Sequence, residues 1–118
     1  MEFEIVFYKD KHGKSPIEEF LIELIESNRI LVTKTRQAIT KLRYRIYHKE
    51  PLSKHLEQGL WELRVKSETN ILRIVYTFRK GQIIILLHVF IKKQQKTPVN
   101  DLEIARKRLR EIRLKEAN

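Results

Sequence analysis

The sequence predicts an α+β domain in the order β-α-α-β-β-β-α, with its helices packed on one side of a mainly antiparallel sheet. Three observations predict this fold: two helical apolar stripes near the start, three alternating segments in the second half, and a further helical stripe at the end. With 118 residues and 42% hydrophobic content, the chain is long enough for one compact core and too short for two. We therefore expect residues 1–118 to form a single domain.

The first half begins with a short strand and a helix. Residues 3–8 alternate in the strand period with apolar side chains on both faces, and a turn at residues 10–13 ends the strand. Ser15, Pro16 and Glu18 mark a helix start, because serine can cap, proline fits the first helical position, and glutamate completes a capping box. Apolar residues then recur at helical spacing, namely Ile17, Phe20, Leu21, Leu24 and Ile25.

A second helix is expected after an interruption at Ser27 and Asn28. Its apolar stripe consists of Leu31, Thr35, Ala38, Leu42 and Ile46. Basic residues lie largely off this stripe, and Pro51 is expected to close the helix. The pattern predicts two antiparallel helices after the first strand.

The second half predicts a meander of three strands, at residues 60–66, 70–78 and 82–91. In the first of these strands, residues facing the core alternate with a polar face made of Glu62, Arg64 and Lys66. The second strand is apolar on both parities apart from Arg73 and Thr77, and Arg73 interrupts one apolar face. Residues 80–82 carry a tight turn signal before the third strand.

A final helix is expected to start at Asn100, which would cap it, with Glu103 at the capping-box position. Its apolar stripe consists of Leu102, Ala105, Leu109 and Ile112.

The charge balance limits the kinds of partner. The chain has 25 Lys and Arg against 15 Asp and Glu, which gives a formal net charge of +10 and favours a polyanionic partner such as RNA. The chain has no cysteine, which removes disulfides, thiolate metal sites and thiol nucleophiles. No apolar run approaches the length of a membrane helix and no signal peptide is visible, so we expect a soluble, cytoplasmic protein with no membrane partner.

Cationic side chains gather on the predicted sheet. Arg64 and Arg73 lie on consecutive strands and become cross-strand or diagonal neighbours if they share a face. Lys92 and Lys93 leave the next strand on opposite faces, so at least one points toward the arginine face. Guanidinium forks bind phosphate oxygens, and lysine supplies a compact cation that can donate a proton. The set suits phosphodiester cleavage, in which an RNA substrate could use its own 2′-hydroxyl as nucleophile.

Residues close to this set have two interpretations each. His88 is either a general acid or base, or a hydrogen-bonded core histidine. Phe90 either stacks on a base or fills the core. Lys66 and Lys96 either contact RNA phosphates or belong to a solvated charged surface.

Several other residues favour structural roles. Arg64 has Glu62 as a same-face partner, so it could equally be an ion-paired surface residue. Trp61 has the parity of the buried face and is predicted to be structural. No metal site or other cofactor is expected, because the remaining histidines lie in predicted turns without neighbours at ligand spacing: His12, His48 and His55.

Four segments in this order resemble the phage-related HigB branch of the RelE/ParE toxin superfamily: GLWELRVK at 59–66, ILRIVYTF at 71–78, LLHVFIKKQQKTP at 86–98 and EIARKR at 103–108. The resemblance covers most of the chain, and the third segment is the most specific. It implies a RelE-like fold, a curved antiparallel sheet with two N-terminal helices and a C-terminal helix. It also implies a ribosome-dependent mRNA endoribonuclease of a type II toxin–antitoxin system, neutralised by a HigA-like helix-turn-helix antitoxin. Operator DNA would be contacted only through that antitoxin.

By position, the resemblance assigns catalytic roles to Arg64, Arg73, His88, Lys92 and Lys93. Some members of the superfamily use a histidine pair, or a C-terminal tyrosine or histidine, but residues 112–118 offer neither. If His88 is buried, no histidine needs to take part, and cleavage is then expected to depend on arginine and lysine electrostatics, with the ribosome helping to order the substrate.

Two alternatives remain open at this level. The chain could act on DNA gyrase without cleaving RNA, as in the ParE branch. It could also be a non-catalytic nucleic-acid-binding module, with the basic helix at residues 34–45 contacting phosphates. That helix lacks the turn and compact recognition helix of a helix-turn-helix motif.

Overall fold

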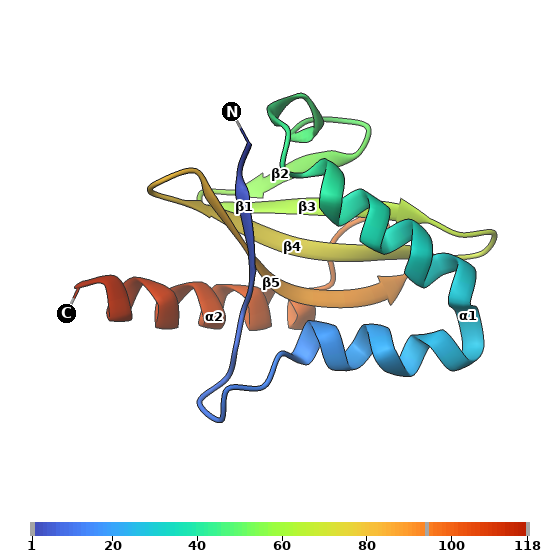
Figure 1. The fold of residues 1–118 in the computed structure, drawn as a ribbon, viewed down its shortest axis with the longest axis horizontal. Helices are drawn as coiled ribbons and strands as arrows, with labels where there is room; N and C mark the ends of the chain where they lie inside the picture. Colours follow the sequence, from blue (N-terminus) through green and yellow to red (C-terminus); the bar gives the residue numbers. More distant parts are fainter. Residues whose placement is uncertain (1, 94, 118) are drawn as a thin grey trace.

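The computed structural model describes residues 2–93 and 95–117 and contains one mixed sheet and two α-helices (Figure 1). The elements follow the chain in this order: β1 (Glu4–Phe7), α1 (Pro16–Lys41), the 3₁₀ helix η1 (Arg45–Tyr47), β2 (Ser53–Glu57), β3 (Leu60–Lys66), β4 (Ile71–Arg79), β5 (Ile83–Lys92) and α2 (Val99–Ala117).

The sheet has the strand order β1-β5-β4-β3-β2. β1 runs parallel to β5, and the other three pairings are antiparallel, so the predicted α+β class and mainly antiparallel sheet are confirmed. The sequence did not predict β2, which forms one edge of the sheet. Its sequence SKHLE is short and mostly polar, and a bulge interrupts its pairing between His55 and Glu57, so its alternation is weak.

α1 consists of two helical arms that meet at an angle (Figure 1). The angle lies at Asn28, whose backbone is not helical (φ −157°, ψ 73°), so the predicted interruption at Ser27 and Asn28 is confirmed. The Asn28 side chain accepts a hydrogen bond from the Leu31 backbone N–H (3.1 Å) and thereby caps the second arm. The predicted cap of the first arm is also confirmed, because Ser15 Oγ accepts from the Glu18 N–H at 3.2 Å.

The predicted end of the second helix was wrong. α1 ends at Lys41 instead of continuing to Pro51, and Ile46 lies in η1 with 68% of its surface exposed. The carbonyl groups just after the last turn of α1 contact groups outside the helix, so the helical hydrogen bonds do not continue. The Phe3 N–H donates to the Arg43 carbonyl (2.8 Å), and His48 Nε2 lies 2.6 Å from the Leu42 carbonyl.

The prediction that the helices pack on one side of the sheet was also wrong. α1 buries Leu21 and Ala38 in a cluster with one face of β4, represented by Leu72 and Ile74. α2 packs on the opposite face of the same sheet, in a cluster made of Leu60, Val75, Leu87, Phe90, Ala105 and Leu109. The central strand β4 is apolar on both faces, so each face of the sheet has to be covered by a helix. Strand alternation does not tell which helix covers which face.

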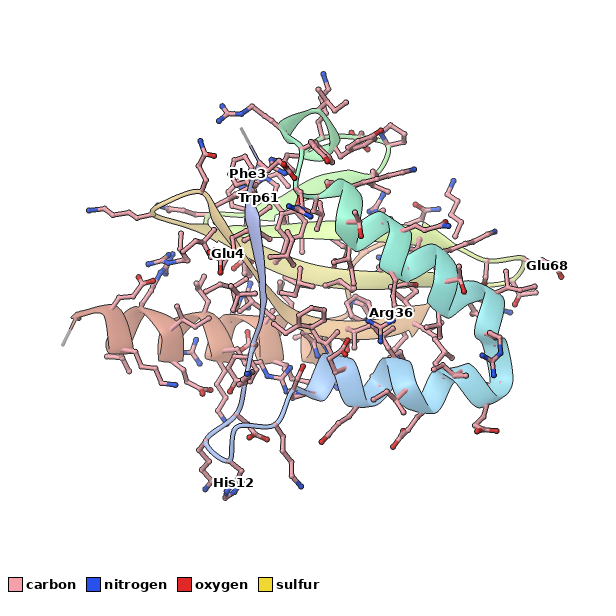
Figure 2. All side chains as sticks on the ribbon, viewed as in Figure 1. Phe3, Glu4, His12, Arg36, Trp61 and Glu68 are labelled. Atoms are coloured by element: carbon pink, nitrogen blue, oxygen red, sulfur yellow. The ribbon has the colours of Figure 1, made fainter. Side chains whose placement is uncertain are left out.

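Aromatic side chains close one end of the α1 face. Trp61 packs edge-on against Phe78 (ring centroids 4.7 Å apart), and Phe78 packs in turn against Phe3 and His48. Figure 2 shows Phe3 and Trp61 together in this region, far from His12 in the turn after β1. This packing confirms the structural role of Trp61 and gives His48 one as well.

The apolar stripe of α2 is confirmed, since Ala105 and Leu109 are buried and Leu102 and Ile112 pack against them. Its predicted start was two residues late, because Asn100 was expected to cap a helix that in fact begins at Val99. Asn100 lies within the first turn instead of capping it, because the Leu102 N–H already bonds the Pro98 carbonyl (3.0 Å). Two ion pairs, Arg106–Glu57 and Arg79–Glu116, and a contact between His88 Nε2 and Asp101 Oδ1 join α2 to the sheet.

Candidate active site

The strand register brings most of the predicted site residues onto one face of the sheet, the face on which α2 packs. Arg64 lies directly opposite Arg73, and Arg73 lies opposite Phe90. The neighbouring rows across the same face are Lys66–Ile71–Lys92 on one side and Lys54–Glu62–Val75–His88 on the other. The structure therefore confirms that Arg64 and Arg73 share a face.

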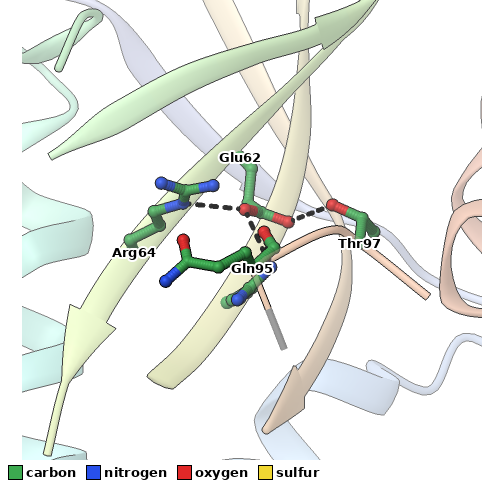
Figure 3. A network of polar contacts seen from close by, with 5 residues as sticks. Glu62, Arg64, Gln95 and Thr97 are labelled. Carbon is green, nitrogen blue, oxygen red and sulfur yellow. Dashed lines mark hydrogen bonds and ion pairs between the residues drawn. The ribbon is translucent and has the colours of Figure 1, made fainter. Parts of the chain in front are cut away.

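The carboxylate of Glu62 contacts both arginines, and Figure 3 shows it pointing toward Arg64. Its Oε1 accepts a hydrogen bond from Arg64 Nε at 3.0 Å and lies 3.6 Å from Arg73 Nη1. Two like charges directly opposite on adjacent strands repel each other, and a shared carboxylate offsets this repulsion. The predicted Arg64–Glu62 pair exists, but the predicted polar face is not a solvated one, because the Glu62 side chain has no exposed surface.

Arg73 is fully buried at the centre of this group. Its Nη1 donates to the backbone carbonyl of Gln95 at 3.2 Å, so the segment that follows β5 lies against it. Burial lowers the pKa of Arg73, while the Glu62 carboxylate opposes that shift and Arg64 adds to it. The Gln95 carbonyl therefore occupies one of the donor groups with which Arg73 could bind a phosphate.

A cleft of about 340 Å³ opens beside Arg64. The described residues that line it are Lys54, His55, Leu56, Arg64, Gln95, Lys96, Thr97 and Leu102. Arg64 is the deeper cation of this set, with 18% of its side chain exposed, and Lys54 and Lys96 are exposed at the cleft. Three cations around one hollow form a site in which a phosphate can bind.

Sequence reasoning missed Lys54 and His55, because it missed β2. Lys54 pairs with Glu62 and so lies on the face of the sheet that carries Arg64 and Arg73, which we call the cationic face. His55 has the opposite parity, and its ring packs against Trp61 with centroids 4.9 Å apart, yet the residue also lines the cleft. A short polar run that ends at Gly59, directly before the predicted strand at residues 60–66, is the weak signal that could have indicated an edge strand.

His88 and Phe90 have the surroundings of core residues. Phe90 is 5% exposed and stacks on His88 with ring centroids 5.6 Å apart, so this geometry agrees with its core-packing interpretation, and base stacking stays a prediction. His88 Nε2 lies 2.8 Å from Asp101 Oδ1 and outside the set that lines the cleft. Burial lowers the pKa of His88, and Asp101 opposes the shift. Of its two interpretations, the structural one agrees with this geometry.

Three of the predicted lysines, Lys66, Lys92 and Lys93, lie at the ends of β3 and β5. Lys66 and Lys92 flank Ile71 on the cationic face and are exposed. Lys93 follows the last residue of β5 and is also exposed. These side chains lie outside the set that lines the cleft and extend the positive charge beyond it.

Within residues 2–93 and 95–117, no three His, Cys, Asp or Glu side chains are grouped as a metal site requires. In the same part of the chain, neither helix combines the length and the apolar character that a bilayer span needs.

The sequence also matches a model of a known protein family. Residues 20–110 match the family described as phage derived protein Gp49-like (DUF891), a stretch that includes most of α1, all of β2–β5 and half of α2. No curated protein matches the sequence. The match spans well over half of the 118 residues, and the chain belongs to the Gp49-like family, a RelE-like family of toxins related to toxin–antitoxin systems.

Proposed function

We propose that this protein is the toxin of a type II toxin–antitoxin pair and that it cleaves mRNA on the ribosome. The observation that supports this most is the cationic cleft beside Arg64, together with Arg73, which lies opposite Arg64 on the next strand. The two strands that hold these arginines are central in the sheet, so the guanidinium groups have little freedom to move.

The chemistry follows from the side chains at the cleft. Arg64 binds the nonbridging oxygens of the scissile phosphate, and Lys54 and Lys96 attract the adjoining backbone. The 2′-hydroxyl of the RNA gives its proton to a base and attacks phosphorus, the bond from phosphorus to the 5′ oxygen breaks, and that oxygen takes a proton, so no net proton is gained or lost. The products are a 2′,3′-cyclic phosphate and a 5′-hydroxyl. The cations stabilise the charge that develops at phosphorus without requiring a metal ion. Of the side chains at the cleft, the ammonium groups of Lys54 and Lys96 can supply that proton.

The partners proposed with this activity are mRNA, the ribosome and a HigA-like antitoxin, in the cytoplasm. A net charge of +10 favours an antitoxin with an acidic or apolar docking element, and favours ribosomal RNA as the first point of contact. Operator DNA would be bound by the antitoxin.

Primer extension on a translated message after brief induction tests the proposal. We expect new 5′-hydroxyl ends within codons, dependent on ribosomes and absent for Arg64→Ala. Intact message with arrested replication would favour gyrase inhibition instead. Intact message with normal replication, together with RNA binding, would favour a non-catalytic module.

A further inference from the structure

Glu62 holds more than the two arginines. Its Oε1 faces Arg64 and Arg73, and its Oε2 accepts a hydrogen bond from the Thr97 hydroxyl at 2.7 Å (Figure 3). We call Glu62, Arg64, Arg73, Gln95 and Thr97 the Glu62 cluster. One carboxylate therefore connects β3, β4 and the segment between β5 and α2.

The position of Glu62 is costly unless all these contacts are made. A carboxylate and a guanidinium without exposed surface are both removed from water, and each is tolerated only when it is paired and hydrogen-bonded. If Glu62 served only as an ion-pair partner of Arg64 on the surface, it would need neither burial nor a hydrogen bond from Thr97. The buried arrangement indicates that Glu62 has a positioning role beyond pairing with Arg64.

The segment at residues 95–97 lies between the cleft and Arg73. Gln95 and Thr97 line the cleft, while the Gln95 carbonyl accepts from Arg73. RNA entering the cleft meets Arg64 first. A phosphate oxygen that takes the place of the Gln95 carbonyl at Arg73 Nη1 has to displace this segment, and the Thr97–Glu62 hydrogen bond opposes that displacement.

We propose that Glu62 is a positioning residue that fixes both guanidinium groups and, through Thr97, holds segment 95–97 over Arg73 until substrate phosphate displaces it. The consequence for RNA rests on the proposed function, whereas the shielding of Arg73 does not. The arrangement restricts the two-arginine site to substrates that bind well enough to move the segment.

Thr97→Val tests the hydrogen bond with little change in shape. Loss of one hydrogen bond should raise the fraction of molecules in which segment 95–97 has moved away from Arg73 by about fivefold. The matched control is Thr40→Val, which removes a hydroxyl bond to the Arg36 carbonyl on the exposed side of α1. Modification of arginines by phenylglyoxal, followed by peptide mass spectrometry, reports the exposure of Arg73 directly, with Arg43 (48% exposed) as internal reference.

In the wild type, Arg73 should react far more slowly than Arg43. Thr97→Val should raise the Arg73 rate by about fivefold while Arg43 and the Thr40→Val control stay unchanged. Glu62→Gln should also raise it, and Glu62→Asp should restore slow reaction in part. Equal reactivity of Arg73 and Arg43 in the wild type, or no effect of Thr97→Val, overturns the proposal.

Cleavage kinetics on ribosomes separate this role from the proposed function. For Thr97→Val we expect KM to fall by about fivefold with kcat retained, and for Glu62→Gln we expect kcat to fall because the guanidinium groups lose their alignment. If no form of the protein cleaves mRNA while Thr97→Val exposes Arg73, the nuclease function fails and the positioning role stands. If the wild type cleaves but Thr97→Val changes neither Arg73 reactivity nor KM, the positioning role fails alone.

Discussion

Arg64 and Arg73 lie directly opposite each other on β3 and β4, and one carboxylate oxygen of Glu62 lies 3.0 Å from the first and 3.6 Å from the second. The two arginines differ sharply in access. Arg64 borders the cleft with 18% of its side chain exposed, and Arg73 has no exposed surface. This difference predicts different phenotypes for the same substitution at the two positions.

Arg64→Ala should reduce mRNA cleavage by about a hundredfold, because a charged donor at the reacting phosphate is lost. Arg64→Lys should cost about tenfold, since lysine keeps the charge and loses the bidentate fork. Initial rates on ribosome-bound message measure both, with thermal melting as the folding control. Equal activity of Arg64→Ala and the wild type would remove Arg64 from the site.

Arg73→Ala should lower the free energy of unfolding by about 3–5 kcal/mol, because it leaves the buried Glu62 with one cation fewer. Arg36→Ala removes the arginine of an exposed pair with Glu18 and should cost at most about 1 kcal/mol.

Urea unfolding of the two variants gives this comparison. Loss of toxicity in Arg73→Ala therefore needs to be measured at a temperature where the variant is still folded. Similar small losses for both variants would contradict the burial of Arg73.

Lys96→Ala should weaken binding to a 2′-O-methyl RNA and reduce the slope of log affinity against log salt by about 0.7, the contribution of one phosphate contact with a single strand. The control Lys34→Ala removes the same charge from the exposed surface of α1. It should leave the slope unchanged. Titrations by fluorescence anisotropy at several salt concentrations provide the slopes, and identical slopes for both variants would place the RNA elsewhere.

The stability of the protein should decrease on acidification through the titration of His88. Burial lowers its pKa in the folded state below the ordinary 6.5, with Asp101 opposing and Arg108 adding to the shift. The unfolded chain then binds more protons than the folded one, so stabilisation is present above about pH 6.5 and is lost as the pH falls through the folded-state value.

Urea unfolding between pH 7.5 and pH 5 should show this decrease, and His88→Asn should flatten it. His12→Asn, in the exposed turn after β1, is the control and should follow the wild type. A wild-type profile without a slope in this range would show that the Asp101 contact outweighs burial.

The register of β3 and β4 decided that Arg64 and Arg73 share a face, which the sequence had left open. Strand alternation could indicate which residues lie on the same side of one strand, because successive side chains point to opposite faces. The same holds for the helix start at Ser15 and the kink at Asn28, since caps and interruptions are local chemistry.

The remaining features of the site were decided by contacts between distant parts of the chain. The Gln95 carbonyl that shields Arg73 lies 22 residues further along, and the Thr97 hydroxyl that bonds Glu62 lies 35 residues away. The placement of α2 on the face opposite α1, the edge strand β2, and the burial of Glu62 depend in the same way on which layers meet. Local pattern determines the direction of each side chain, but the packing of distant segments determines its burial and its partners.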